Sequence, residues 1–174
     1  MNKISVLDIV RWTTVDGTGF RTSVYSAGCS FRCPGCHNPQ SWDIRRGRKM
    51  DVDELMDLLC EDETNVTFSG GDPLFQAEGF TELAKRLKQE TKKNIWCYTG
   101  YRFEEILASA KLSALLPYID VLVDGRFVLA LRDESLLFRG SANQRLIDVP
   151  ASLRQGKAVN YTTGQALMGL YRAG

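Results

Sequence analysis

The chain has 174 residues, with 22 Lys and Arg against 21 Asp and Glu, so its formal net charge is +1. A charge this close to zero provides no electrostatic attraction for nucleic acid, and no nucleic-acid partner is expected. No segment approaches the roughly 20 consecutive apolar residues of a membrane span, so no membrane association is expected either. The length is typical of one domain, which we expect to extend over residues 1–174 of a cytoplasmic protein.

Strand-like and helix-like segments alternate along the chain. Apolar runs predict strands at residues 20–27, 65–69, 94–100, 119–125 and 145–149. Helices are predicted after Asp51, around Phe80 to Leu87, after Phe103 and after Pro150. The strand at 119–125 is a continuous apolar run, which is typical of a strand buried on both faces.

This alternation predicts an α/β fold class, because strand–helix–strand units place parallel strands in one sheet with right-handed crossovers. A closed barrel of eight such units needs about 200–250 residues. The present chain has room for about five to six βα units, so we expect a partial, open (β/α) barrel. Ligands gather at the carboxyl ends of the strands in such sheets.

The cysteines provide the most specific signal. Cys29, Cys33 and Cys36 have the spacing Cys-x-x-x-Cys-x-x-Cys directly after the first predicted strand. Thiolates this close together on a loop can converge on an iron–sulfur cluster. Three ligands on a four-iron cluster leave one iron open to a substrate. We therefore predict that these three cysteines are metal ligands.

Two other interpretations of the cysteines are weaker. A structural zinc site needs four ligands, and the single histidine, His37, directly follows Cys36 and is badly placed to be the fourth. Cys60 and Cys97 lie in apolar runs and are expected to be small core residues. A disulfide framework is disfavoured because the number of cysteines, five, is odd and no secretory signal is visible.

A second motif, Ser69-Gly70-Gly71-Asp72-Pro73, follows the strand predicted at 65–69. The glycines allow the backbone to approach a ligand closely, and the Asp72 carboxylate can pair with an ammonium group. The same residues also suit an ordinary turn. Their position at the end of a strand, after the cysteine loop, favours ligand binding by residues 69–72.

Polar residues also follow the strand predicted at 119–125. Asp124 and Arg126 form either a plain polar loop or a hydrogen-bond partner and a cation for a bound carboxylate. The basic residues Arg45, Arg46, Arg48 and Lys49 are expected to form a solvated turn, with docking of an acidic partner as the alternative.

Five segments together resemble the glycyl-radical-enzyme activases of the radical S-adenosylmethionine (SAM) family. They are DGTGFRTSVYSAGCSFRCPGCHNPQSWD, SGGDP, WCYTGY, DVLVDGRFV and LLFRGSANQR, and they extend over roughly residues 8–149. The VDGRFV and RGSANQR segments are similar to the branch that acts on anaerobic ribonucleoside-triphosphate reductase. The resemblance implies a barrel of the radical SAM type.

The resemblance also implies the cofactors and their contacts. A 4Fe–4S cluster would be held by the three cysteines, with SAM chelating the fourth iron through its amino and carboxylate groups. Further SAM contacts are implied for Gly35, Cys36, His37 and the Gly70-Gly71 loop. Many such motifs have an aromatic residue where this chain has Gly35, so adenine must pack elsewhere, against His37 or backbone.

The implied reaction is reductive cleavage of SAM to a 5′-deoxyadenosyl radical, which abstracts hydrogen from a glycine of the partner reductase. A flavodoxin-like protein is the implied electron donor. No catalytic acid or base is expected from the chain, because the cofactors do the chemistry. The alternatives are activation of another glycyl radical enzyme, a short radical SAM enzyme for a small molecule (such as the 7-carboxy-7-deazaguanine synthases), and a non-catalytic zinc-binding adaptor.

Overall fold

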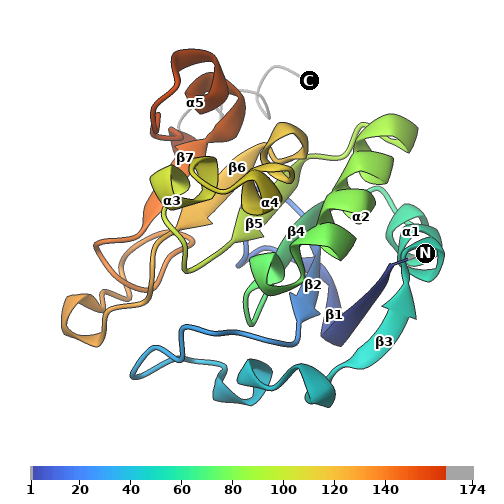
Figure 1. Ribbon diagram of the computed structural model, residues 1–174, viewed down its shortest axis with the longest axis horizontal. Helices are drawn as coiled ribbons and strands as arrows, with labels where there is room; N and C mark the ends of the chain where they lie inside the picture. The colour runs from blue at the N-terminus through green and yellow to red at the C-terminus, as the bar shows by residue number, and fades with distance from the viewer. Residues whose placement is uncertain (1, 164–174) are drawn as a thin grey trace.

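A computed structural model of the protein describes residues 2–163. Seven strands form one open sheet in the order β3-β1-β2-β4-β5-β6-β7 (Figure 1). The strands are β1 (Lys3–Thr13), β2 (Arg21–Ser26), β3 (Arg48–Asp51), β4 (Asn65–Gly70), β5 (Ile95–Tyr98), β6 (Val121–Asp124) and β7 (Arg145–Asp148). The helices are α1 (Val52–Cys60), α2 (Ala77–Glu90), α3 (Phe103–Leu107), α4 (Ala110–Ser113) and α5 (Val149–Gln155). No helix in residues 2–163 is both long enough and apolar enough to cross a membrane.

The sheet is mixed rather than fully parallel. Strands β2, β4, β5 and β6 are parallel, which confirms the α/β class and the open sheet. Strand β1 is antiparallel to both β2 and β3, and β7 is antiparallel to β6. The expected five to six βα units are therefore too many. The turn at residues 14–20 between β1 and β2 is too short for a parallel crossover, which needs about a dozen residues.

The basic run was expected to be a turn, but its second half forms the edge strand β3. Arg48 and Lys49 are exposed on this strand, whereas Met50 is buried. Charged side chains on an edge strand oppose pairing with other chains. The first half of the run lies in a short 3-10 segment, Ile44–Arg46, and is exposed.

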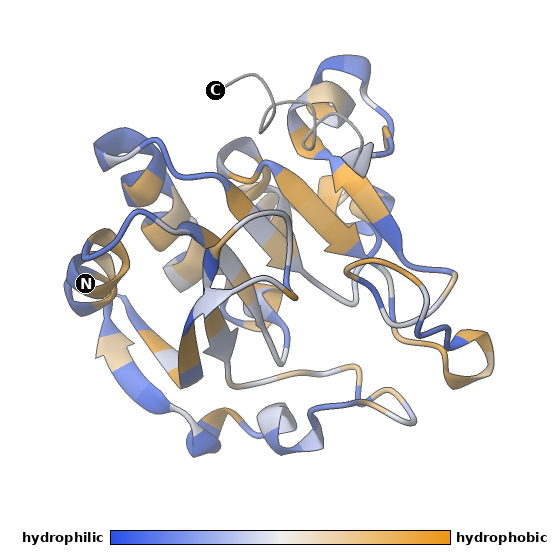
Figure 2. Cartoon of the chain, turned by 180° about the vertical axis from the view of Figure 1, so that it is seen from behind, coloured by the Kyte–Doolittle hydropathy of each residue, from blue (hydrophilic) through white to orange (hydrophobic). Residues whose placement is uncertain are grey.

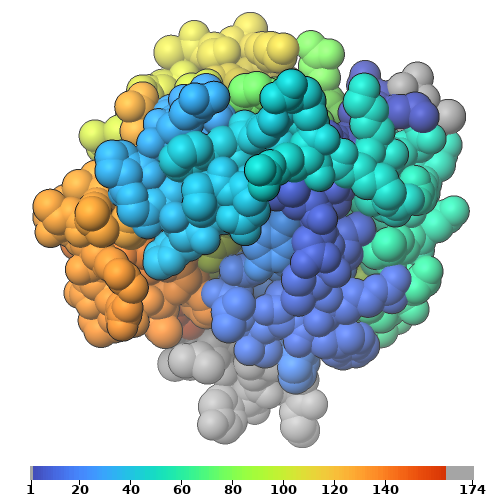
Figure 3. Space-filling model, turned by 90° about the horizontal axis from the view of Figure 1, so that it is seen from below, coloured from blue at the N-terminus to red at the C-terminus, as the bar shows by residue number. Residues whose placement is uncertain are grey.

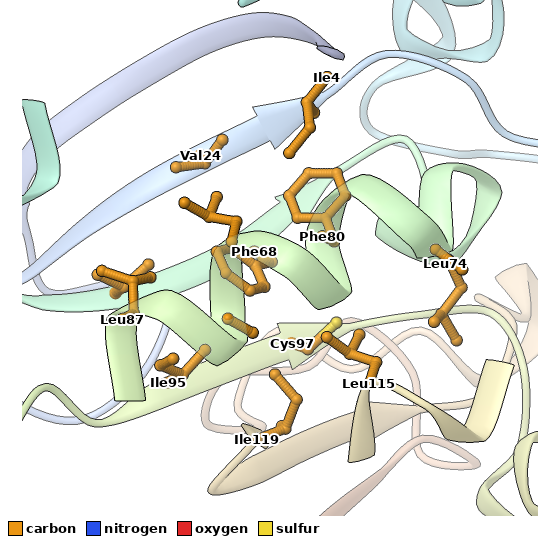
Figure 4. Close-up of a cluster of buried hydrophobic side chains, with 14 of the residues drawn as sticks. Ile4, Val24, Phe68, Leu74, Phe80, Leu87, Ile95, Cys97, Leu115 and Ile119 are labelled. Carbon is orange, nitrogen blue, oxygen red and sulfur yellow. The ribbon is translucent and has the colours of Figure 1, made fainter. Parts of the chain in front are cut away.

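Helices α1 and α2 cover one face of the sheet, and most of the apolar core lies beneath them (Figures 1 and 4). Figure 2 shows orange, hydrophobic stretches on the central strands and the inner sides of these helices. Phe68 on β4 meets Phe80 on α2 edge to face, with ring centroids 4.9 Å apart. The helical face predicted for α2 is confirmed because its members are all fully buried: Phe80, Leu83, Ala84 and Leu87.

The two cysteines outside the loop have different surroundings. Cys97 is fully buried under α2, as predicted, and burial raises the pKa of its thiol well above the usual value. The prediction for Cys60 is wrong, because this residue is exposed at the end of α1. The buried face of α1 is formed by Val52, Leu55, Met56 and Leu59.

The opposite face of the sheet contains a buried arginine. Arg21, at the start of β2, is fully buried, and burial lowers the pKa of its guanidinium to about 10. The guanidinium donates to Thr67 Oγ1 at 2.7 Å and to the carbonyl oxygens of Val66, at 2.7 Å, and Thr18, at 3.0 Å. It also lies over the indole of Trp96, 5.4 Å from the ring centroid. Arg21 therefore fastens the turn at residues 14–20 to β4 and β5.

We predict that Arg21→Met lowers the free energy of unfolding by roughly 2–5 kcal/mol, because several buried oxygens lose their donor. Urea denaturation monitored by circular dichroism measures this change. The matched control is Arg46→Met, at an exposed position, which should alter stability by less than about 0.5 kcal/mol. Equal midpoints for the two variants would contradict this account of Arg21.

Candidate functional site

A cavity of about 610 Å³ lies at the carboxyl ends of the parallel strands. Its walls come from the cysteine loop after β2, the glycines after β4, the segment after β5 and the loop after β6. Figures 1 and 3 show the cysteine loop, in light blue, beside the orange loop at 126–141. The segments that follow the four parallel strands therefore meet at this edge of the sheet.

The three predicted ligands line this cavity. Cys29, Cys33 and Cys36 are all half-buried and belong to its wall. A turn closed by the Cys36 N–H and the Cys33 carbonyl, at 3.1 Å, brings the last two together. The Cys36 sulfur also accepts a hydrogen bond from the Asn38 N–H at 3.4 Å. Neither Cys60 nor Cys97 lines the cavity.

The donor set suits an iron–sulfur cluster. Thiolates are the usual ligands of such clusters. Within residues 2–163, no three His, Cys, Asp or Glu side chains are arranged to hold a single metal ion. A cluster has its iron atoms at separate corners, so its cysteine ligands do not have to meet at one point. The three thiols on one wall of a cavity fit this requirement.

Backbone hydrogen bonds tie the cysteine loop to the rest of the sheet. At its entry, the N–H groups of Gly28 and Cys29 donate to the carbonyls of Ser41 and Trp42, at 2.7 and 3.2 Å. From the other side, the Asp72 N–H donates to the Gly28 carbonyl at 2.9 Å. Trp42 also lines the cavity. The loop is therefore held at both ends.

Gly70 and Gly71 line the cavity, and the structure gives a packing reason for both. A Cβ on Gly71 would lie 2.4 Å from the Gly28 carbonyl oxygen. A Cβ on Gly70 would lie 2.4 Å from the Ser26 nitrogen, and its φ of +99° is unfavourable for other residues. The two glycines are thus needed for β4 to pass the cysteine loop, whether or not a ligand is bound.

Asp72 borders the cavity but is only 2% exposed, and its carboxylate is fully engaged. It accepts hydrogen bonds from the N–H groups of Leu74, at 2.9 Å, and Gly100, at 3.0 Å, and from the Thr99 hydroxyl at 3.0 Å. Burial raises the pKa of this carboxyl to about 6. Asp72 therefore joins the ends of β4 and β5, and its pairing with a ligand ammonium stays a prediction.

The structure does not bring Asp124 into the cavity. Its carboxylate is 1% exposed, accepts from the Phe103 N–H at 2.8 Å and from Arg145 Nε at 3.0 Å, and so faces α3 and β7. Arg126 does line the cavity, where its guanidinium lies 4.6 Å from the centroid of the Phe31 ring.

Two further residues of the cysteine loop were predicted to contact a ligand, and only one of them lines the cavity. His37 lines the cavity, with its ring 5.4 Å from that of Phe127. Gly35 is outside the wall and packs under Leu129, where an added Cβ would approach the leucine side chain to 2.8 Å. Its φ of +76° gives a second reason for glycine at this position.

Several wall residues were not predicted, and most are aromatic. Phe31, Phe127, Tyr25 and Tyr98 all line the cavity. The Tyr25 hydroxyl donates to the carboxylate of Asp16. Burial and this carboxylate raise the pKa of Tyr25, so its hydroxyl stays protonated. Tyr25 and Tyr98 could have been inferred, because alternation along β2 and β5 turns them away from the helix-covered face.

Arg139 is a further unpredicted wall residue. It lines the cavity and donates from one terminal nitrogen to the Gln144 carbonyl at 3.0 Å. Its Nε is buried and has no hydrogen-bond partner within the described part of the chain. A buried donor without a partner is costly, so this guanidinium is available for an anionic ligand group.

Comparisons with known proteins agree with this site. The family described as "4Fe-4S single cluster domain" matches residues 15–147. A protein of Haemophilus influenzae is 38% identical over 140 residues, covering 75% of this chain and 88% of the relative. A protein of Escherichia coli K12 is 36% identical over 139 residues, covering 75% of this chain and 89% of the relative. A protein of Enterobacteria phage T4 is 34% identical over 139 residues, covering 76% of this chain and 86% of the relative. All three are named anaerobic ribonucleoside-triphosphate reductase-activating proteins.

The chain belongs to this family. Its cysteine loop therefore lies in a 4Fe–4S domain, which confirms the iron–sulfur prediction and removes the zinc-binding adaptor. The resemblance found in the sequence is confirmed at the level of the reductase-activating branch.

We predict that Gly71→Ala lowers both stability and iron content, because its Cβ would displace the Gly28 carbonyl and with it the cysteine loop. Iron analysis after anaerobic reconstitution and thermal unfolding measure the two effects. The control is Gly19→Ala, where φ is +71° but nothing lies within 4 Å of the added Cβ, so about 1 kcal/mol and no iron should be lost. Full iron content with weakened SAM binding in Gly71→Ala would instead assign this glycine to ligand contact alone.

Proposed function

We propose that the protein is a radical SAM activase that places a glycyl radical on an anaerobic ribonucleoside-triphosphate reductase. The observation that supports this most directly is that three cysteines, and not four, line the cavity. Three thiolates leave one iron of a 4Fe–4S cluster without a protein ligand, as SAM chelation requires. The names of its relatives indicate the reductase as the protein that is activated.

The chain's residues have separate roles in this proposal. Cys29, Cys33 and Cys36 would hold the cluster, and the backbone of Gly70 and Gly71 would lie against SAM. When bound, the two cofactors would supply the radical chemistry that removes a hydrogen atom from a glycine of the reductase. The chain binds, orients and shields these groups, and no side chain has to act as acid or base.

The aromatic wall supplies the adenine contact that the glycine at position 35 cannot. Phe31, Phe127 and Tyr98 offer flat apolar surface inside the cavity, and aromatic rings stack well on bases. The Tyr25 hydroxyl is held by Asp16 and cannot also donate elsewhere. We infer that adenine packs on this aromatic wall, with His37 beside Phe127 at its edge.

We further propose a radical SAM barrel in a single domain and a flavodoxin-like electron donor. The open sheet, with its cavity at the carboxyl ends of four parallel strands, is consistent with a partial barrel of the radical SAM type in a single domain, residues 1–174. A flavodoxin-like donor would reduce the cluster. Free thiols that ligate iron are typical of the reducing cytoplasm, which is where we place the reaction.

The decisive experiment uses anaerobic, reconstituted protein with a reductant, SAM and the reductase. We expect a glycyl radical doublet in the electron paramagnetic resonance spectrum, located on the reductase. Deuterium at the reductase glycine should appear in 5′-deoxyadenosine. Label transfer from a small metabolite, with no radical on any glycyl radical enzyme, would support a small-molecule enzyme instead.

The cysteine assignment is tested separately. Cys29→Ala, Cys33→Ala and Cys36→Ala should each abolish cluster assembly or SAM cleavage, because two thiolates cannot hold the site. Cys60→Ala is the control: its side chain is exposed and outside the cavity, so iron content should be unchanged. Equal iron loss in Cys60→Ala would show that the ligands are misassigned.

Two arginines are candidates for binding the SAM carboxylate. We infer that Arg139 makes the stronger contact, because its Nε lacks a partner, whereas Arg126 is exposed and already lies over Phe31. Arg139→Gln should therefore weaken SAM binding by about tenfold or more, since a charged hydrogen bond contributes about 1.5–3 kcal/mol. Equilibrium titration of the reconstituted variants measures this. If Arg126→Gln weakens SAM binding more than Arg139→Gln does, the carboxylate is bound by Arg126, the residue predicted from the sequence.

A further inference from the structure

The loop between β6 and β7, residues 126–141, forms one wall of the cavity. A network around Gln144 holds its two ends together. The Gln144 side chain accepts from the Gly140 N–H at 2.9 Å and donates to the Gly125 carbonyl at 3.0 Å. Asn143 Nδ2 donates to the Arg126 carbonyl at 2.8 Å.

The middle of the loop is also paired. The Ala142 N–H donates to the Leu131 carbonyl at 2.8 Å, and the Asp133 N–H donates to the Gly140 carbonyl at 3.1 Å. The Ser141 hydroxyl accepts from the Val128 N–H at 3.1 Å. The RGSANQR segment therefore builds a loop with one defined conformation.

Apolar side chains point from this loop in two directions. Phe127, Leu136 and Phe138 line the cavity, and Phe138 packs on Trp96 with ring centroids 5.3 Å apart. Four others are exposed although they lie within ten residues: Val128 by 37%, Leu129 by 52%, Leu131 by 45% and Leu137 by 62%. Such a concentration of exposed apolar side chains on a fixed loop marks an interaction surface.

We propose that the exposed side of this loop (Val128, Leu129, Leu131 and Leu137) is the docking surface for the reductase segment that carries the glycine. This inference rests on the proposed function and adds the place of contact. The surface lies on the loop that forms the cavity wall, so a chain bound to it lies beside the cysteine loop. Leu129 touches both regions, since it packs over Gly35.

The chemistry of the loop selects the kind of partner. The charges of the loop nearly cancel, with Arg126, Arg132 and Arg139 against Asp133 and Glu134, and Arg132 pairs with Glu134. The surface therefore suits an uncharged segment with apolar side chains near the glycine. It does not suit an acidic flavodoxin-like donor, which would need a basic face.

The test uses reconstituted protein and the intact reductase. Leu131→Glu and Leu137→Glu should each raise the dissociation constant for the reductase by about ten- to a hundredfold, as for central interface residues. The yield of glycyl radical on the reductase, measured at limiting concentrations of the activase, should fall because less complex forms. Iron content and the rate of SAM cleavage measured without reductase should be unchanged, because neither side chain lines the cavity.

The matched control is Leu153→Glu on α5, where the leucine is 39% exposed and outside the cavity. Reductase binding as in the unmodified protein is expected for this variant. Unchanged binding by both loop variants, or equal weakening by all three, would overturn the docking surface. So would altered sedimentation of the activase alone with unchanged reductase affinity, because that outcome assigns the surface to a second copy of this chain.

These outcomes are distinguishable from failure of the proposed function. If the unmodified protein produces no radical on the reductase, the proposed function fails before any variant is measured. If it produces the radical and the loop variants do so equally well at limiting concentration, only the docking surface is wrong.

Discussion

The site depends on one close backbone contact, between the entry of the cysteine loop and the end of β4. The N–H groups of Gly71 and Asp72 donate to the carbonyls of Ser26 and Gly28 at 2.8 and 2.9 Å. There is no room at Gly71 for even a Cβ. This contact continues the β2–β4 pairing beyond the sheet, so the first cysteine starts from a position set by the backbone. Backbone contacts of the fold thus set the entry of the cysteine loop.

One face of the sheet packs against the apolar core, and the other contributes to the cavity wall. On one face, α1 and α2 cover an apolar core that contains Phe68 and Phe80 and contributes most of the buried hydrophobic surface. On the other face, Arg21 and Trp96 hold the turn at residues 14–20, and beyond them lie Tyr25 and Tyr98 in the cavity wall. A buried cation is tolerated there because the backbone carbonyls around it satisfy its donors. The cavity therefore does not interrupt the packing on which stability depends.

Much of this arrangement could be predicted from local patterns, but contacts between distant residues could not. The cysteine spacing correctly indicated an iron–sulfur domain, and the apolar periodicity located α2 and all four parallel strands. Strand β1 was missed because only its first half has a buried face. Asp124 was predicted to contact a ligand because it ends a strand, but Arg145, 21 positions later, donates a hydrogen bond to its carboxylate. The packing role of Gly71 depends on Gly28, 43 positions earlier, and has no local signature.

In the proposed function, the loop at 126–141 would connect cofactor binding with partner recognition. Phe127 and Phe138 face the cavity, whereas their neighbours Val128 and Leu137 face solvent. Adjacent side chains of one loop therefore form both surfaces, so movement of the outer side would alter the cavity wall. The hydrogen bonds of Gln144 limit such movement and keep the inner wall in place when the outer side is free. A rigid loop of this kind loses little conformational entropy on binding, so more of the contact energy of its exposed leucines remains available for affinity.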